Sequence, residues 1–268
     1  MTNGLYANKA ESPLQPDISK RGTYQELFWD WNPTCKKNTA HISQFCTGSE
    51  GNLITLIPDG CRSFVFECGD NPIGRVHGIR RKNVVFALKP NTEYFAFKPY
   101  TTQGMRKGAM GWHELVDDCV DFELLYPNSG IAGRLKEAKS FKDRVAVWMD
   151  FTRKYLIDDS YNTDLVEYSE LMICQSKGAI KIDKLCEVLG YTSRYCREKF
   201  KEAQGISIKS YSEIIRFQNS VRLLANDKVN ALDVAYSGNY YDQSHFIKEF
   251  KKFANRTPQS FKKQYYVE

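Results

Sequence analysis

The chain of 268 residues is longer than one typical domain of about 100 to 200 residues, so we expect two domains. Its hydrophobic fraction of 42% and charged fraction of 26% exclude an intrinsically disordered chain. The formal net charge of +6 favours a polyanionic partner without requiring one.

Residues 1–22 are predicted to form a loose N-terminal arm. This segment is polar, carries Pro13 and Pro16, and lacks the apolar stretch of a secretion signal. No other segment has the length and apolar character of a transmembrane helix. We therefore expect a cytoplasmic protein that has no membrane association, with its eight cysteines as free thiols because the cytoplasm is reducing.

Residues 23–110 have the pattern of an all-β domain. Short apolar runs are separated by turn sequences rich in glycine, proline and asparagine, and aromatic residues recur at period two in Phe64 with Phe66 and in Phe95 with Phe97. This pattern predicts a small β-barrel or sandwich. The four phenylalanines either fill its core, which we favour, or line an effector pocket.

Two cysteines of this domain, Cys61 and Cys68, are candidates for a redox or metal sensor. Two thiols do not complete a zinc site, and a cysteine beside a strand is more often a packing residue. We therefore interpret both as packing residues.

Residues 111–160 change to helical periodicity. Leu135, Val145, Trp148 and Leu156 recur near helical spacing, with charged residues between them. We place the boundary of a C-terminal domain, residues 161–268, after this stretch, and Asp164 is a candidate N-cap of the first helix of that domain.

The most informative feature is an internal repeat at a spacing of 50 residues, between residues 199–211 and 249–261. Each copy belongs to a unit in which a short amphipathic helix is followed by a turn and then by a second helix. The turn is Gly190-Tyr191-Thr192 in the first unit and Gly238-Asn239-Tyr240 in the second. Thr192 or Ser193 caps the second helix of the first copy, and Asp242 caps that of the second. Residues 211–224 between the copies predict one long amphipathic helix, which would hold the two units at a fixed separation.

The second helix of each copy has one apolar and one polar face. Cys196, Phe200 and Ala203 share the buried side of the first, and Phe246, Phe250 and Phe253 that of the second. The opposite faces carry polar and cationic side chains: Arg194, Arg197, Glu198 and Lys201 in the first, and Ser244, Lys248 and Lys251 in the second. An α-helix with such a face fits the major groove of DNA.

These motifs resemble the DNA-binding domain of the AraC/XylS family of bacterial regulators. The matching features are Leu-Cys-Glu-Val-Leu-Gly-Tyr at 185–191, Arg-Glu-Lys-Phe-Lys at 197–201, Tyr-Tyr-Asp-Gln-Ser-His-Phe at 240–246, and Thr257-Pro258. The chain departs from the family pattern at Cys186, Ile208, Asn239 and Asn255. Asn239 and Asn255 replace glycines, and asparagine tolerates the left-handed conformation that such turns require. The motif Pro58-Asp59-Gly60-Cys61 is similar to the cupin-like effector domains of some members.

The resemblance implies an α+β chain with a cupin-like β-barrel or sandwich and trailing helices, then an all-α domain of two helix-turn-helix units joined by a long helix. It implies base contacts from Arg194, Arg197 and Glu198 in the first unit, and from Gln243, Ser244, His245 and Lys248 in the second. Lysines 201, 251 and 252 are expected to contact phosphates, and Ser193 completes the predicted DNA-binding set. The helices of residues 111–160 are expected to support a homodimer.

The expected function is therefore transcription regulation, by an activator that binds double-stranded promoter DNA, works with RNA polymerase and responds to a small effector or to its dimer state. No catalysis, cofactor or metal is expected, because the histidines at 41, 77, 113 and 245 are widely spread and form no His-x-His pair. Two alternatives stay open. One is a cupin-like metal- or thiol-dependent enzyme or sensor fused to a DNA-binding domain, and the other is an antagonist of another regulator that does not bind DNA.

Overall fold

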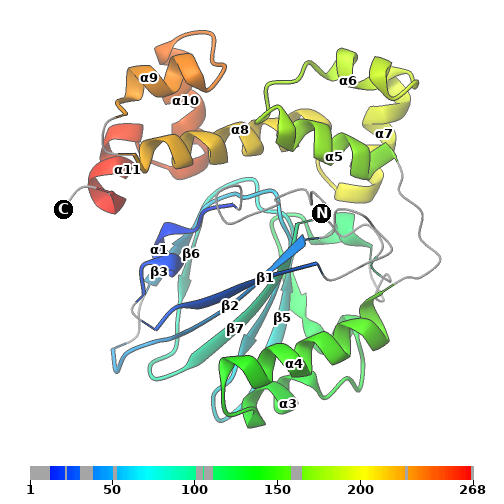
Figure 1. Cartoon of the computed structure of the whole chain (residues 1–268), viewed down its shortest axis with the longest axis vertical. Coiled ribbons are helices and arrows are strands. Elements are labelled where there is room, and N and C mark those ends of the chain that lie inside the picture. The colour runs from blue at the N-terminus through cyan, green and yellow to red at the C-terminus, as the bar shows by residue number, and fades with distance from the viewer. Residues whose placement is uncertain are drawn as a thin grey trace.

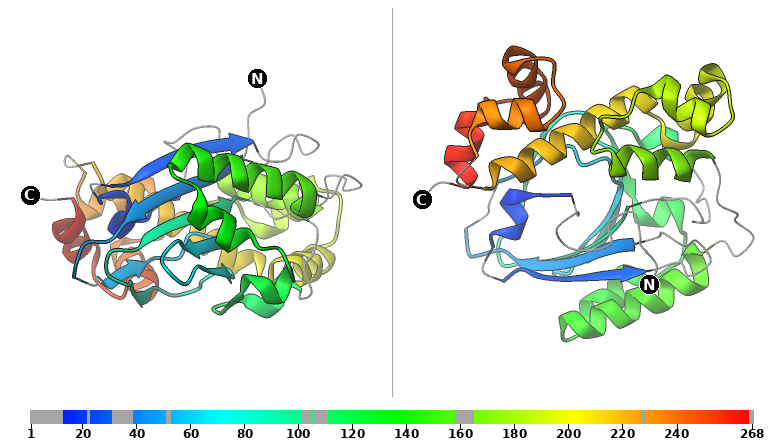
Figure 2. Two further views of the ribbon diagram at one scale, coloured as in Figure 1. Left: turned by 90° about the horizontal axis from the view of Figure 1, so that it is seen from below. Right: turned by 45° about the horizontal axis from the view of Figure 1, so that its top comes forward.

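The computed structural model describes residues 13–21, 23–30, 39–50, 53–100, 105, 111–157, 165–226 and 229–266. It confirms the predicted α+β class: a domain of two β-sheets with trailing helices is followed by a domain made only of helices (Figure 1). The helical domain lies on one side of the sheet domain, and α3 and α4 lie on the opposite side (Figures 1 and 2).

Eight described strands form two antiparallel sheets. The larger sheet has six strands in the order β1-β2-β7-β4-β5-β8, and the smaller pairs β3 with β6. The bounds are β1 (Gln25–Asp30), β2 (Thr39–Cys46), β3 (Leu53–Leu56), β4 (Ser63–Glu67), β5 (Ile73–His77), β6 (Val84–Ala87), β7 (Glu93–Pro99) and β8 (Cys119–Asp121).

Side-chain alternation separates a packed face of the larger sheet from a hollow one. Phe64 pairs across the strands with Phe97, and Phe66 with Phe95. All four rings are fully buried, and each lies within 6.3 Å of Trp148 of helix α4, measured between ring centroids. Successive residues of a strand point to opposite faces, so the alternate positions Ser63, Val65, Ala96 and Lys98 face the space between the two sheets.

This placement favours the first of the two interpretations of the four phenylalanines. Phe64, Phe66, Phe95 and Phe97 belong to the core and do not line the cavity between the sheets, so their predicted place in an effector pocket gains no support. Period-two spacing predicted that they share a face, but it could not say that helices cover that face.

The helices after β7 cover the packed face of the larger sheet. Their bounds are η2 (Trp112–Leu115, a 3₁₀-helix), α2 (Phe122–Leu125), α3 (Ile131–Glu137), α4 (Phe141–Phe151) and η3 (Thr152–Leu156, a π-helical turn). Ser140 caps α4 by accepting a hydrogen bond from the backbone N–H of Asp143. Trp148 of α4 lies at the centre of this core, which agrees with the helical spacing of residues 135–156.

The described residues of the predicted N-terminal arm include α1 (Pro16–Ser19). Leu14 forms a hydrogen bond with Gln218 of the helical domain, and Gln15 forms one with Ile57 of the sheet domain. Residues 1–12 and 22 lie outside the described part of the chain.

Seven helices make up the C-terminal domain. They are α5 (Leu165–Gln175), α6 (Ile182–Val188), α7 (Ser193–Gln204), α8 (Ile208–Leu224), α9 (Ala231–Ser237), α10 (Gln243–Ala254) and α11 (Pro258–Tyr265). The predicted long helix between the repeats is α8, and its buried residues share one core with both flanking units. The candidate cap Asp164 lies outside the described residues. None of the helices in the described ranges combines the length and apolar character needed to cross a lipid bilayer.

Candidate DNA-binding surface

The first helix-turn-helix unit consists of α6 and α7. The turn between them contains Gly190 at φ +75°, and Thr192 starts α7 by accepting a hydrogen bond from the N–H of Tyr195. Gly205 ends α7 at φ +77°. Cys196 and Phe200 of α7 are fully buried, which leaves the opposite side of the helix to solvent.

The exposed side of α7 carries the predicted contact residues Arg194, Arg197, Glu198 and Lys201. Arg194 donates to Glu198 at 3.0 Å, and Arg197 donates to Asp183 of α6 at 3.3 Å. Ion pairs this exposed are weak, so both arginines can exchange their carboxylate partners for DNA. Ser193 is half-buried and donates to Asp183 at 2.7 Å, which ties the start of α7 to α6.

The second unit, α9 and α10, repeats this construction with different residues. Asn230 caps α9, and Asp242 caps α10 by accepting from the N–H of His245 at 2.7 Å. Asn239 in the turn and Asn255 at the end of α10 adopt φ +60° and +55°. Both asparagines thus take the left-handed conformation expected of the glycines they replace.

The exposed side of α10 presents Gln243, Ser244, His245, Lys248 and Lys251. Lys252 is also exposed, and its predicted phosphate contact stays a prediction. It forms an ion pair with Glu213 of α8 at 2.6 Å and lines a groove beside Arg81 and Lys82 of the sheet domain.

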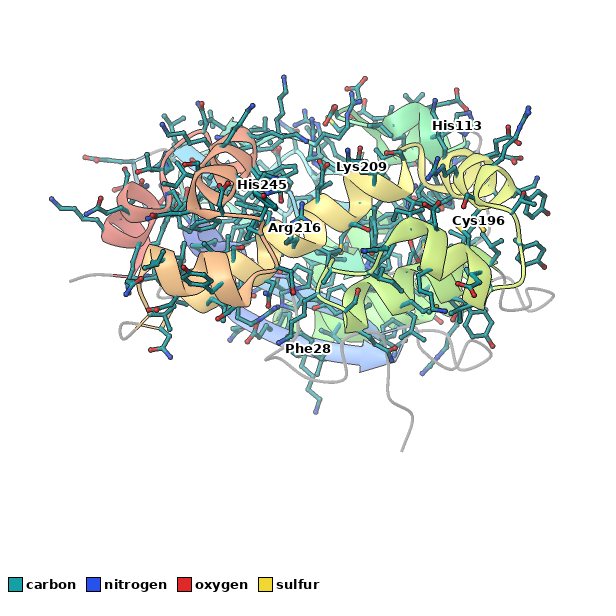
Figure 3. All side chains as sticks on the ribbon, turned by 90° about the horizontal axis from the view of Figure 1, so that it is seen from above. Phe28, His113, Cys196, Lys209, Arg216 and His245 are labelled. Carbon is teal, nitrogen blue, oxygen red and sulfur yellow. The ribbon has the colours of Figure 1, made fainter. Side chains whose placement is uncertain are left out.

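The spacer α8 is fixed rigidly to α10 by a buried ion pair. Nε of Arg216 donates to Oε1 of Glu249 at 2.9 Å, and one Nη nitrogen donates to Oε2 at 2.5 Å (Figure 3 labels Arg216). Burial alone would lower the pKa of Arg216, but the hydrogen-bonded Glu249 carboxylate outweighs it and the pKa is raised. The guanidinium also lies 5.0 Å from the ring centroid of Tyr240 in the turn.

Both candidate recognition helices, α7 and α10, rest on the sheet domain through their C-terminal ends. Gly205 lies against His113 and Val116 beside η2, and Lys252 and Phe253 border the groove formed with residues 80–84. The N-terminal halves of α7 and α10 therefore carry the surface that is free of the sheet domain. In HTH proteins this half of the helix approaches base edges.

Exposed tyrosines near the start of both helices were missed by the sequence analysis. Tyr191 and Tyr195 stack with ring centroids 5.2 Å apart, and Tyr241, directly before Asp242, is 93% exposed. The sequence signals that could have indicated them are the i, i+4 spacing of Tyr191 and Tyr195 and the position of Tyr195 on the side of α7 opposite Phe200. An aromatic residue so exposed has no role in the core.

Comparisons with known proteins find similarity in the C-terminal helical domain. A family model described as a helix-turn-helix domain matches residues 185–264. The Msm operon regulatory protein of Streptococcus mutans is 21% identical over 140 residues, which are 52% of this chain and 50% of that protein. The probable transcription factor PqrA of Proteus vulgaris is 27% identical over 99 residues, 37% of this chain and 80% of that protein. This chain thus spans half the length of the first of these relatives.

Solved structures include a probable AraC family transcriptional regulator from Rhodopseudomonas palustris, with 21% identity and a TM-score of 0.35 over 38% of this chain and 97% of that chain. ToxT of Vibrio cholerae has 12% identity and a TM-score of 0.42 over 91% of this chain and 99% of its own. The matched residues extend from α6 to α11, so the chain carries a helix-turn-helix domain at its C-terminus and is similar there to AraC-type regulators.

Proposed function

We propose that the protein is a transcription regulator that binds promoter DNA with α7 and α10 together. The observation that carries the proposal is the shared construction of the two units: each recognition helix buries its apolar side and exposes a polar, cationic one, and α8 joins the units through a common core. Arginine donates well to guanine, glutamine pairs with adenine, and glutamate accepts from cytosine. The exposed residues thus supply the donors and acceptors that base recognition needs.

Binding DNA through this surface involves no chemical reaction, so no catalytic activity is proposed. Among the described residues no group of three or more His, Cys, Asp or Glu side chains is arranged to hold a metal ion. Burial raises the pKa of the Cys61 thiol well above its usual value, which opposes thiolate chemistry there. Both features weigh against the enzyme alternative.

Regulation is proposed to occur through a cavity of about 290 Å³ between the two sheets. Its wall combines apolar side chains such as Ile57 and Val65 with a polar cluster that includes His41, Asp59 and Lys98. Oxygen-bearing small molecules fit such a mixed lining. An effector bound there would be sealed by α1, whose residue Ile18 borders the cavity.

We further propose that the protein activates transcription through contact with RNA polymerase. We also propose that it forms a homodimer through the helices of residues 111–160. A dimer would bind two operators at once and gain affinity through effective concentration. Sedimentation of the purified protein with and without DNA tests the dimer, and in vitro transcription from a bound promoter tests activation.

DNA binding itself is tested by selecting preferred duplexes from a random pool and measuring affinity by fluorescence anisotropy. We expect the double variant Arg197→Ala/Lys248→Ala to bind the selected duplex at least tenfold more weakly. The control double variant Arg75→Ala/Lys89→Ala removes two exposed cations of the sheet domain, outside both the recognition helices and the proposed dimer helices, and should leave affinity unchanged. Equal affinity of all three proteins would refute the assigned surface, and no selection by the parent protein would support the antagonist alternative.

A further inference from the structure

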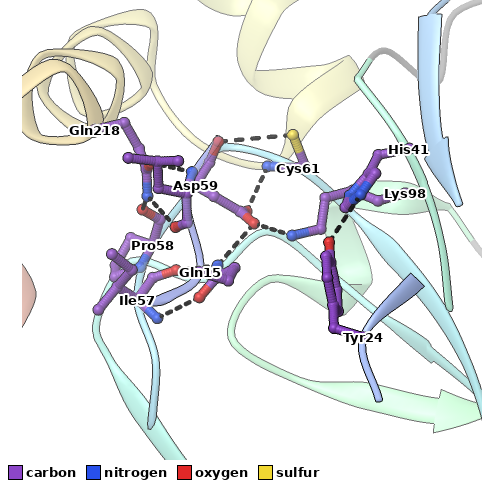
Figure 4. Close-up of polar contacts among 10 residues, drawn as sticks. Gln15, Tyr24, His41, Ile57, Pro58, Asp59, Cys61, Lys98 and Gln218 are labelled. Atoms are coloured by element: carbon purple, nitrogen blue, oxygen red, sulfur yellow. Dashed lines mark hydrogen bonds and ion pairs between the residues drawn. The ribbon is translucent and has the colours of Figure 1, made fainter. Parts of the chain in front are cut away.

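The loop that connects β3 to β4, residues 57–62, touches the cavity and the DNA-binding domain with alternate residues. On the side of α8, the carbonyl of Pro58 accepts from Nε2 of Gln218 at 2.7 Å (Figure 4). A side chain at Gly60, which adopts φ +76°, would meet the ring of Tyr211 at 3.1 Å. The loop thus passes α8 in close backbone contact that a larger residue would disturb.

On the other side of the loop, Asp59 and Cys61 border the cavity. The Asp59 carboxylate forms an ion pair with Lys98 of β7 and accepts from Nε2 of Gln15 at 2.9 Å and from the N–H of Cys61 at 3.0 Å (Figure 4). Burial alone would lower the pKa of Lys98, but Asp59 outweighs it and the pKa is raised, so the lysine stays charged. A ligand with an anionic or hydrogen-bonding group would compete with Asp59 for this lysine.

The next residue, Arg62, leaves the cavity and holds the end of the first recognition helix. Its Nη1 donates to Oε1 of Gln204 at 2.6 Å, and its Nη2 donates to the carbonyls of Ala203 and Gln204 at 3.3 and 3.2 Å. Gln204 in turn donates to Glu170 of α5 at 2.5 Å. A cation at the C-terminal end of a helix also interacts favourably with the helix dipole.

This contact is deeply buried. Arg62 is 3% and Gln204 is 1% exposed, and the guanidinium lies 5.3 Å from the ring centroid of Trp112 in η2. Burial lowers the pKa of Arg62 to about 10, which leaves it protonated at neutral pH. A buried, charged contact with two main-chain carbonyls fixes the end of α7 more firmly than surface pairs can.

We propose that Arg62 is a positioning residue for α7, and that residues 58–62 transmit the state of the Asp59–Lys98 pair in the cavity to this recognition helix. The inference rests on the proposed function and assigns its regulation to a particular segment. Only two residues, Gly60 and Cys61, separate Asp59 from Arg62, and Gly60 is confined by α8, so a shift of Asp59 is passed to Arg62 rather than absorbed by a long flexible loop. The segment thereby joins two sites through one continuous set of contacts.

Hydrogen exchange of the full-length protein tests the relay without a known ligand. Lys98→Met removes the partner of Asp59 but touches no residue of α7. We expect both Lys98→Met and Arg62→Met to raise the exchange rates of amides 203–206 at least fivefold. Lys98→Arg, which keeps the ion pair, should restore the original rates. In an Arg62→Met background, Lys98→Met should have no additional effect on these amides.

The matched control is Arg144→Met, which removes another buried arginine of the sheet domain, bonded to Gln44 and Glu93 and not to α7. It should leave amides 203–206 unchanged under conditions in which the variant is folded. The proposal is overturned if Lys98→Met leaves these amides protected, or if its effect is as large without Arg62 as with it.

Measurements of DNA binding distinguish a failure of this inference from a failure of the proposed function. With the selected duplex, Arg62→Met should weaken protection of the sub-site bound by the first unit at least threefold and leave the other sub-site within twofold. Equal loss at both sub-sites would contradict a positioning role for Arg62. Failure of the parent protein to bind DNA would overturn the proposed function, whereas the exchange experiment would still decide whether the relay exists.

Discussion

Arg216 of α8 and Glu249 of α10 form a two-pronged ion pair inside the second helix-turn-helix unit, with a 2.9 Å hydrogen bond from Nε. Both side chains are largely buried, at 17% and 7% exposure. Breaking one partner leaves an uncompensated buried charge, which typically costs about 3 to 5 kcal/mol.

We therefore expect Arg216→Met to lower the free energy of unfolding by about 2 to 4 kcal/mol, since the pair retains slight solvent access. The measurement is urea denaturation followed by circular dichroism. Arg134→Met is the control, because its pair with Asp150 is exposed and should contribute less than about 1 kcal/mol. Equal losses for the two variants would mean that burial does not strengthen the Arg216 contact.

The end of α10 offers a stabilising substitution. Asn255 adopts φ +55°, and the equivalent residue of the first unit is Gly205 at φ +77°. Asn255→Gly should stabilise the protein by up to about 1 kcal/mol, and Asn255→Ala should destabilise it by a similar amount, because an alanine is strained in this conformation. Thermal unfolding of both variants checks the order Gly above Asn above Ala, and any other order would contradict the left-handed cap.

The C-terminal repeat shows how much the sequence alone predicts. Helical periodicity, Thr192, Asp242 and the turn residues each carry local information, so both units, their caps and the exposed sides of α7 and α10 follow from it. The exposure of Arg197 and Lys248 agrees with the prediction, while their contacts with bases stay predictions.

The remaining features depend on contacts between distant segments. Phe97 shows a strand pattern, but only the packing of Trp148 reveals which side of the sheet is covered. Arg62 and Gln204 are 142 residues apart, and no local pattern pairs them. Lys252 has the same helical environment as its neighbours, and its contact with Glu213 arises from the docking of α10 on α8.

Acidification should weaken the sheet domain through His77. Burial and the nearby cations Arg80, Arg75 and Lys98 lower the pKa of His77 to about 4 from its usual 6.5. The unfolded chain then binds a proton that the folded protein does not, so stability falls as the pH drops from about 6.5 to about 4, by up to about 3 kcal/mol. Unfolding curves across this range for the parent protein and for His77→Asn isolate the contribution, and parallel pH profiles would contradict it.

Substituting the two adjacent lysines of α10 should change the salt dependence of DNA affinity to different extents. Lys251 is exposed on the proposed DNA-binding side, whereas Lys252 is paired with Glu213. Each phosphate contact contributes about 0.9 to the slope of log affinity against log salt concentration. Lys251→Ala should therefore reduce that slope by about 1, and Lys252→Ala should barely change it. The reverse result would place Lys252 on the DNA.

The most direct test of two-helix recognition is to repeat the selection from random duplexes with the single variants Arg197→Ala and Lys248→Ala. If α7 and α10 occupy separate major grooves, each variant loses base preference in one segment only, and the two segments lie about one helical turn, roughly 10 base pairs, apart. If both variants lose preference at the same positions, or neither does, the two helices do not read DNA in the way described.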